Sequence, residues 1–387
     1  MLLSDSITGL SDEHMMSQQS KHELHAAVQA TYLKASKAEK QKILDEFTSI
    51  KLMNTSAIIV TYNPSPEFFD SLNGLKNQFD PLIIIDNASN PEIRDLLRQA
   101  AQKNKGNIEI IFNETNLGIA TALNQGFARS LEQGCDFVFV FDQDSQPAPG
   151  MVGTILDAFH SHPNREKIAI VAPMVEDSAA GINARYLRPR GRFLFERTGC
   201  SDQILEGVAV VITSGSLYNL KAYQKIGPFR DDFFMDYVDT EYCLRAKQHG
   251  YNIIVACNAR LYHRLGNQQK KQFGPLTMHP TFHSPLRWYY ISRNRIPMFR
   301  LYALRFPYWF LYELVINSYG LVRLLLFEDQ KAQKLKALIL GIIDGLRQRM
   351  GPISNCRKEF ITKGSSNAMG TLFVPPVRDN KAHRDYK

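Results

Sequence analysis

Cysteine is scarce in this 387-residue sequence, and its few copies lack the spacing that metal sites need. The cysteines are odd in number, widely separated and free of CxxC pairs: Cys135, Cys200, Cys243, Cys257 and Cys356. They therefore predict neither a zinc site nor a framework of disulfide bonds. We expect a protein that works in a reducing compartment.

Long apolar segments are also missing. No run of about 18 apolar residues occurs in the chain. The N-terminal stretch MLLSDSITGLSDEHMMSQQ has neither the basic start nor the apolar centre of a signal peptide. These absences predict a cytoplasmic protein without a transmembrane helix.

The glycine-rich loops that bind phosphate through backbone amides are absent as well. GxGxxG does not follow the first predicted strand, and GxxxxGK[ST] does not occur. A ligand that carries phosphate would then need a cation to hold it.

An alternation of apolar and helical segments is present from Ser56 onward. AIIVTYNP, PLIIIDNAS, NIEIIFN and DFVFVFDQD predict strands, and PEFFDSLNGLKNQF, PEIRDLLRQAAQKN and GIATALNQGFARSLEQG predict the helices between them. This alternation is typical of βαβ units, so it predicts the α/β fold class with a central, mostly parallel, Rossmann-like sheet. Residues 1–52 predict a helical N-terminal extension, packed on the main domain or on a second subunit, and we assign it no function.

Short polar residues follow each predicted strand. They are Thr61 and Asn63, Asp86, Asn116 and Gly118, and finally Asp142 and Asp144. Ligands of such sheets bind at the carboxyl ends of the strands. Asn and Asp are common in any turn, but four polar strand ends in succession favour a polar ligand site.

Asp142 and Asp144 follow the most apolar strand of the chain, in FVFVFDQDS. Two carboxylates at i and i+2 point to the same side of an extended segment. There they can hold a hard divalent ion and, through it, attract a pyrophosphate. The pair predicts a metal-assisted site for a nucleotide diphosphate.

Six motifs resemble those of a known family, in order and spacing. AIIVTYNP, IIIDNAS, NLGIATALNQG, FDQDS, GPFRDDFFMDYVDTEYCLRAKQHGY and ARLYHRLG look like the successive motifs of the family 2 glycosyltransferases with the GT-A fold, most closely the bacterial rhamnosyltransferases. The resemblance runs from about Ser56 to Arg300. It implies a GT-A nucleotide-sugar-binding domain over residues 53–283.

The resemblance also implies roles for individual residues. Thr61 and Asn63 would flank the nucleotide, Asp86 would contact its base or ribose, and Asn116 and Gly118 would lie near the nucleoside and phosphates. FDQDS would be the DXD motif, in which Asp144 is the principal ligand of Mg²⁺ or Mn²⁺ and Asp142 points to the ribose or sugar. His263 matches a histidine that joins the metal or diphosphate site in relatives.

The general base is implied less directly. Many relatives carry EDxD before CLR, whereas this chain reads VDTE, with Val238 and Glu241 where acids or Asp are usual. Asp239 is the implied base, and Asp236 is the alternative. Single displacement needs a base and a Lewis acid on opposite faces of the sugar, and it inverts the anomeric carbon without a covalent nucleophile. Gly215, in ITSGSLYNL, predicts either a lining for the acceptor pocket or a packing role.

Positive charge and aromatic side chains gather in residues 284–350. Eleven Lys and Arg stand there against four acids, most of the net charge of +8. Arg mixed with Trp, Tyr and Phe can indicate nucleic acid, but the leucine and isoleucine content favours amphipathic helices on an anionic membrane surface. Residues 284–387 therefore predict a membrane-associating helical region with a polar tail, and no nucleic-acid partner.

These observations together predict an inverting hexosyltransferase at the inner face of the plasma membrane. The expected donor is dTDP-rhamnose, and the expected acceptor is a lipid-linked glycan of a bacterial surface polysaccharide such as an O-antigen of lipopolysaccharide. The alternatives are a UDP-hexose donor, or a non-catalytic membrane-associated binder of nucleotide sugars. Self-association into a homo-oligomer is left open.

Overall fold

A computed structural model describes residues 55–75, 78–103, 107–177, 182–263, 271–273, 276–278 and 282–362. The predicted N-terminal extension over residues 1–52 and the polar tail after residue 362 lie outside the described residues.

Four parallel strands form the first half of the central sheet, as the sequence predicts. They are β1 (Thr55–Thr61), β2 (Leu82–Asp86), β3 (Ile108–Phe112) and β4 (Phe137–Asp142), in the spatial order β4-β1-β2-β3. Because they run parallel, their carboxyl ends meet at one edge of the sheet.

The sheet continues beyond β4 through two longer strands, β6 (Ile168–Asp177) and β12 (Asn252–His263), and several short ones, some of them antiparallel. β11 (Leu217–Asn219) is antiparallel to both β4 and β6, and β12 is parallel to β6. The remaining strands are β5 (Gln146–Pro147) and β10 (Ile204–Leu205) on β12, β7 (Ile182–Asn183) on β6, and the separate pairs β8 (Tyr186–Arg190) with β9 (Leu194–Thr198) and β13 (Lys271–Phe273) with β14 (Leu276–Met278). The predicted mixed, mostly parallel sheet is confirmed.

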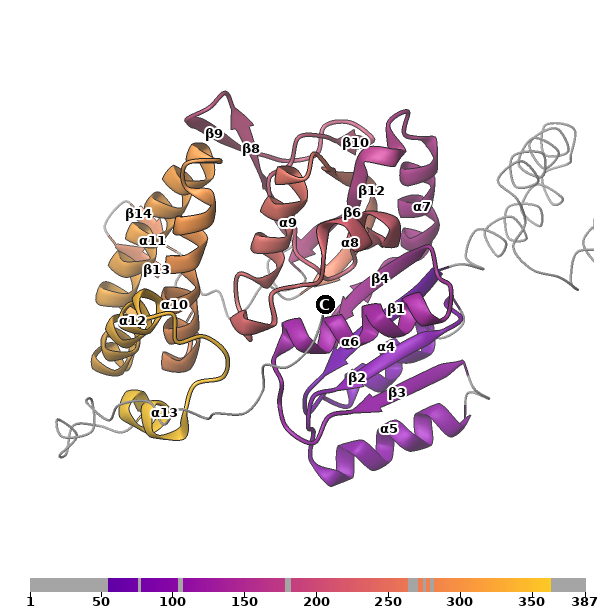
Figure 1. The fold of residues 1–387 in the computed structure, drawn as a ribbon, viewed down its shortest axis with the longest axis horizontal. Helices are drawn as coiled ribbons and strands as arrows, with labels where there is room; N and C mark the ends of the chain where they lie inside the picture. The colour runs from indigo at the N-terminus through magenta and orange to yellow at the C-terminus, as the bar shows by residue number, and fades with distance from the viewer. Residues whose placement is uncertain are drawn as a thin grey trace, which may run out of the picture.

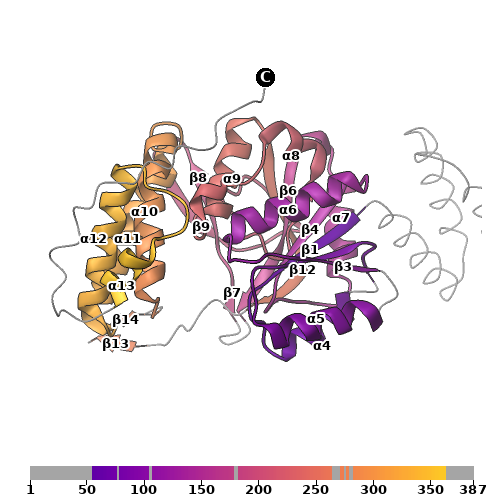
Figure 2. The ribbon, with the colours of Figure 1, turned by 60° about the horizontal axis from the view of Figure 1, so that its bottom comes forward.

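Helices cover both faces of the sheet (Figure 2). On one face lie α6 (Ile119–Glu132), α8 (Leu220–Ile226) and α9 (Val238–Gln248); on the other lie α4 (Glu67–Leu75), α5 (Pro91–Lys103) and α7 (Met151–Ser161). Two 3₁₀ turns, Arg165–Lys167 and Asp231–Phe233, complete this part. Successive strand residues point to opposite faces, so Ile58 joins the core under α6 while Ala57 and Ile59 join the core over α4.

The C-terminal helices stand beside the sheet as a separate group (Figure 1). They are α10 (Pro285–Tyr302), α11 (Pro307–Phe327), α12 (Lys331–Leu346) and α13 (Asn355–Thr362). α10 packs closely on α12 because Gly341 and Gly345 have no side chain, and a Cβ at either position would overlap the backbone of α10. The predicted helical character of this region is confirmed where the structure describes it.

One disulfide bond is present, although the cysteine spacing predicts no framework of disulfide bonds. Cys200, after β9, is bonded to Cys257 in β12, 57 residues further along the chain. Spacing along the chain gives no warning of it, because the fold brings the two cysteines together.

The 21-residue helix α11 has the length and apolar composition of a membrane span, although a few polar residues interrupt its apolar run. Length and composition alone do not make it a span, so the absence of a transmembrane helix stays a prediction.

Candidate active site

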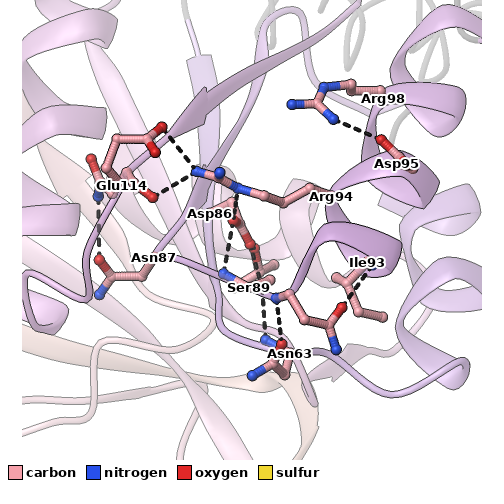
Figure 3. A network of polar contacts seen from close by, with 12 residues as sticks. Asn63, Asp86, Asn87, Ser89, Ile93, Arg94, Asp95, Arg98 and Glu114 are labelled. Atoms are coloured by element: carbon pink, nitrogen blue, oxygen red, sulfur yellow. Dashed lines mark hydrogen bonds and ion pairs between the residues drawn. The ribbon is translucent and has the colours of Figure 1, made fainter.

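The ends of β1 and β2 are joined around the buried Asp86 carboxylate (Figure 3). This carboxylate accepts hydrogen bonds from Thr61 Oγ1 at 3.1 Å and from the backbone N–H of Ser89 at 3.1 Å. Ser89 Oγ donates to the same carboxylate at 2.5 Å, and Arg94 Nε forms an ion pair with the Asp86 carboxylate at 3.4 Å. Asp86 therefore organises the strand ends from inside, and its contact with a nucleotide stays a prediction.

Asn63 belongs to the same network. Its side-chain oxygen accepts from the backbone N–H of Asn90 at 2.8 Å, and its own N–H donates to Ser89 Oγ at 2.7 Å. These bonds fix the β1 end on the start of α5. Thr61, Asn63 and Asp86, which the sequence singles out, thus lie together.

Asn87 follows Asp86 at the polar end of the second predicted strand, where no individual role was predicted for it, and it connects this strand end with the next. Its Nδ2 donates to Asn116 Oδ1 at 3.1 Å and to the Gly118 carbonyl at 3.2 Å. Its Oδ1 accepts from Asn113 Nδ2 at 3.2 Å and from the N–H of Leu117 at 2.9 Å. Only the place of Asn87 directly after Asp86 could have suggested this role.

The backbone angle and the close neighbours of position 118 require a glycine there. Its φ of 85° favours glycine, and a Cβ there would overlap the carbonyl oxygen of Phe234. The start of α6 therefore touches the segment that precedes α9.

Asp142, Asp144 and His263 form a group that can hold a metal ion. β4 ends at Asp142, β12 ends at His263, and the pairing of β5 with β12 brings the two ends together. His263 Nε2 lies 3.8 Å from Asp142 Oδ2, His263 Nδ1 lies 3.6 Å from Asp144 Oδ1, and one ligand atom from each residue lies within 4.8 Å of the others. Two carboxylates and an imidazole suit a divalent cation, so the residues present fit the predicted metal.

Two buried serines support this group. Ser145 Oγ lies 3.2 Å from His263 Nδ1 and 2.5 Å from Ser214 Oγ. Ser214 Oγ accepts from the backbone N–H of Asp142 at 3.0 Å. These contacts orient the histidine and the end of β4, and the sequence did not reveal them because the two serines are 69 positions apart.

Gly215 lies beside these serines and faces the core. Its φ is 73°, and a Cβ there would meet Pro173 and Leu261 at 2.8 and 2.9 Å. Its N–H donates to the Val140 carbonyl at 2.7 Å. Packing thus accounts for the glycine, and contact with an acceptor stays a prediction.

The pKa of Asp142 depends on the other acids of the site. This pKa is raised to about 6, chiefly by burial; the charge of His263 lowers it, and the charges of Asp144 and Asp239 raise it. Asp239, in the first turn of α9 where the sequence placed it at a helix start, therefore lies close enough to act on the metal-holding group through its charge. A divalent cation would offset this mutual repulsion.

The two candidate bases differ in their partners. The Asp239 carboxylate accepts from the N–H of the adjacent Thr240 at 2.7 Å, and burial raises its pKa. Asp236 Oδ1 pairs with Arg287 at 3.1 Å, and its buried Oδ2 has no hydrogen-bond partner among the described residues. Asp236 is thus tied to a cation, whereas Asp239 is bonded within its own helical turn.

Glu241, in the VDTE sequence that departs from the motif it resembles, is buried and paired. Arg245 Nε donates to it at 3.0 Å, and Tyr302 O–H donates to it at 2.7 Å. These bonds link α9 to the end of α10. Glu241 has a structural role in this fold.

The strand order and the group of Asp142, Asp144 and His263 fit the GT-A fold that the sequence predicts. Residues 56–227 match the family model described as Glycosyl transferase family 2. Residues 56–227 thus form a domain of the family 2 glycosyltransferases, and the chain is a glycosyltransferase.

Two curated relatives align with most of the chain. The dTDP-rhamnosyl transferase RfbF of Shigella flexneri is 27% identical over 302 residues, which cover 76% of this chain and 96% of the relative. The galactofuranosyltransferase GlfT1 of Mycolicibacterium smegmatis is 22% identical over 248 residues, which cover 62% and 80%.

Among solved structures, S. aureus TarS aligns with 74% of this chain at 16% identity and a TM-score of 0.41. The alignment covers 43% of the TarS chain, so this chain spans less than half of that length.

Proposed function

We propose that this glycosyltransferase moves L-rhamnose from dTDP-rhamnose to a hydroxyl of a lipid-linked bacterial surface polysaccharide, with inversion. The observation that carries the proposal is the group of Asp142, Asp144 and His263, whose Asp142 is within reach of the charge of Asp239. The rhamnosyl donor is supported by the Shigella relative, whose length the alignment covers almost completely.

Asp142, Asp144 and His263 would hold Mg²⁺ or Mn²⁺, and the bound ion would act as a Lewis acid on the leaving diphosphate. Asp239 takes the proton of the acceptor hydroxyl as that oxygen attacks the anomeric carbon. Because the attack is direct, no carboxylate is needed as a covalent nucleophile, and the configuration inverts. The raised pKa of Asp239 suits a base, since a more basic carboxylate binds the proton more strongly.

Thr61, Asn63, Asp86, Asn116 and Gly118 would form the nucleotide side of the site. Their hydrogen bonds hold the strand ends in place before a ligand arrives, which lowers the entropy lost on binding. Gly215 would lie near the acceptor. These residues belong to the proposed GT-A domain over residues 53–283.

The C-terminal region from residue 284 would attach the enzyme to the cytoplasmic face of an anionic membrane. On α11, large apolar side chains are exposed over most of the helix: Leu311, Leu314, Val315, Ile316, Tyr319, Leu321, Val322, Leu325 and Leu326. Exposed apolar surface of this extent is typical of protein or membrane contacts. The lysines and arginines of the same region favour an anionic membrane.

We infer that α11 lies along the bilayer surface rather than crossing it. Trp309 near its start and Leu324 near its end are both buried in the protein. Between them, Glu313 accepts a hydrogen bond from Tyr237 O–H at 2.5 Å. A helix that contacts the protein at its start, middle and end cannot also cross the hydrocarbon core on its own.

Calorimetric titration with four donors tests the proposal. The purified protein is titrated with dTDP-rhamnose, UDP-glucose, UDP-galactose and GDP-mannose, each with and without Mn²⁺. Metal-dependent binding of dTDP-rhamnose in preference to the others is the expected result. Preference for a UDP-sugar would discard the rhamnosyl assignment and favour the alternative of a UDP-hexose donor. Binding of none would return the non-catalytic alternative.

A further inference from the structure

The segment before α9 has an unfavourable backbone. Within residues 232–237, which we call the 232–237 loop, Phe234, Asp236 and Tyr237 have positive φ angles of 65°, 57° and 64°. Residues other than glycine are disfavoured in this region, and they keep such angles where surrounding contacts enforce them. The loop leads directly into the helical turn that carries Asp239.

Asn294 of α10 supplies three of these contacts. Its Nδ2 donates to the backbone carbonyl oxygens of Phe233, Met235 and Asp236 at 3.0, 2.7 and 2.9 Å. The side chain is fully buried. One amide group thus binds three carbonyls of the same loop, on both sides of Phe234.

Arg293, the preceding residue, is also fully buried and bonds the same loop. Its guanidinium donates to the carbonyl oxygens of Phe233 at 2.8 Å and Asp232 at 3.3 Å, and it also bonds the carbonyl of Gly351. Its Nε donates to Asn294 Oδ1 at 2.9 Å. This last bond fixes the orientation of the Asn294 amide, so that its N–H groups face the loop.

The loop also contacts the nucleotide side of the site. The Phe234 carbonyl accepts from the N–H of Ile119 at 2.7 Å, and its backbone occupies the space that a side chain at Gly118 would fill. The loop therefore connects the start of α6 with the first turn of α9. A change in its conformation would alter the position of Asp239 relative to the nucleotide side.

We propose that Arg293 and Asn294 are positioning residues: they enforce the conformation of the 232–237 loop and so aim the Asp239 carboxylate at the acceptor hydroxyl. The proposal rests on the role of Asp239 as the base in the proposed function. Arg293 acts through Asn294 and through the loop, and neither residue touches the substrates. An error of about 1 Å in the place of a base can cost about 10²-fold in rate.

Asn294→Asp tests the proposal with almost no change in shape. It replaces the two N–H donors of the amide by an acceptor, which repels the three carbonyls. We expect kcat to fall at least tenfold, while the dissociation constant for the donor with Mn²⁺, measured by calorimetry, changes less than twofold. Arg293→Lys keeps the charge but loses the forked geometry, and we expect it to show the same pattern with a smaller fall in kcat.

Asn124→Asp is the matched control. Asn124 Nδ2 donates to the carbonyl of Phe229 at 2.9 Å and its Oδ1 accepts from the N–H of Phe229 at 2.9 Å, so it holds a neighbouring loop by the same chemistry. We expect this variant to lose thermal stability without a tenfold fall in kcat of the folded protein.

Three results would overturn the proposal. They are a kcat of Asn294→Asp within twofold of the parent, parallel losses of kcat and donor affinity, or the same fall in kcat in the control. Should Asn294→Asp fail to fold, Arg293→Lys decides by the same criteria. Asp239→Asn is measured alongside: if it stays fully active, the proposed base is wrong, whatever Asn294 shows.

Discussion

The nucleotide side of the site and the loop that precedes the proposed base are held in different ways. On the nucleotide side, hydrogen bonds join residues 25 to 31 positions apart, which is the distance from one strand end to the next. The 232–237 loop is bonded by residues 58 to 61 positions away, on a helix outside the sheet. The first arrangement follows from the register of parallel strands, whereas the second depends on the docking of the C-terminal helices.

This difference predicts which changes separate donor binding from catalysis. Changes at the strand ends and metal-holding group should affect both, because the proposed site of the donor diphosphate lies there. Changes at α9 and α10 should affect turnover with little effect on donor affinity.

Loss of the metal-holding group should have the largest effect. Asp144→Asn removes a charged ligand, and we expect activity to fall by about 10³-fold, since a Lewis acid supplies several kcal/mol of charge stabilisation. Chelation with EDTA should match this loss in the parent, and Mn²⁺ should restore it. Full activity of the parent enzyme in EDTA would show that the metal is not needed.

Asp239→Asn should lower kcat by about 10²-fold or more while donor binding persists. Asp236→Asn is the comparison, because Asp236 is paired with Arg287 and should cost less. Steady-state kinetics and donor titration of both variants decide between them. A larger loss at Asp236 would assign the base to that residue.

The affinity for Mn²⁺ should depend on pH through Asp142. Its pKa of about 6 means that a proton competes with the metal below that pH, so the dissociation constant should weaken by about tenfold between pH 7 and pH 5. The raised pKa also means that the folded, metal-free protein binds more protons than the unfolded chain between about pH 4 and 6. Its stability should therefore decline as the pH rises through that window.

Calorimetry with Mn²⁺ at several pH values measures the effect of pH on affinity. Asp142→Asn is the control, and its dissociation constant should vary less steeply around pH 6. An unchanged slope would assign the titration to another group.

The smallest expected effect concerns the apolar face of α11. Leu314→Ser with Val315→Ser removes two exposed apolar side chains, and we expect flotation with anionic liposomes to fall several-fold while donor binding stays unchanged. Leu96→Ser, at an exposed position on α5, is the matched control. Equal flotation of the parent and the double variant would show that α11 is not the membrane contact.

Much of the region from β1 to β4 could be predicted from the sequence, because its strands and helices follow from local patterns. The apolar runs define β1 to β4, Pro91 begins α5, and Gly134 follows α6 with a positive φ. Their polar ends then had to meet at one edge. The pair Asp142 and Asp144 could be found for the same reason.

The long-range contacts of the rest of the chain could not be predicted. Apolar periodicity indicates which residues are buried, but it does not indicate which residues they contact. Arg293 and Asn294 look like polar residues in a basic aromatic segment, yet both are fully buried against backbone carbonyls. Glu241 looks like an altered catalytic acid, yet Tyr302 and Arg245 occupy its carboxylate. The Cys200–Cys257 bond also depends on contacts that the fold alone creates.

The hydrogen bonds from α10 to the 232–237 loop bear on how this enzyme is best produced. A chain shortened at residue 283 to remove the apolar helices would keep the proposed metal ligands Asp142, Asp144 and His263 and the proposed base Asp239. It would lack Arg293 and Asn294, and with them the bonds that shape the loop before Asp239. Detergent or lipid added to the longer chain is therefore a better route to soluble, active material than truncation.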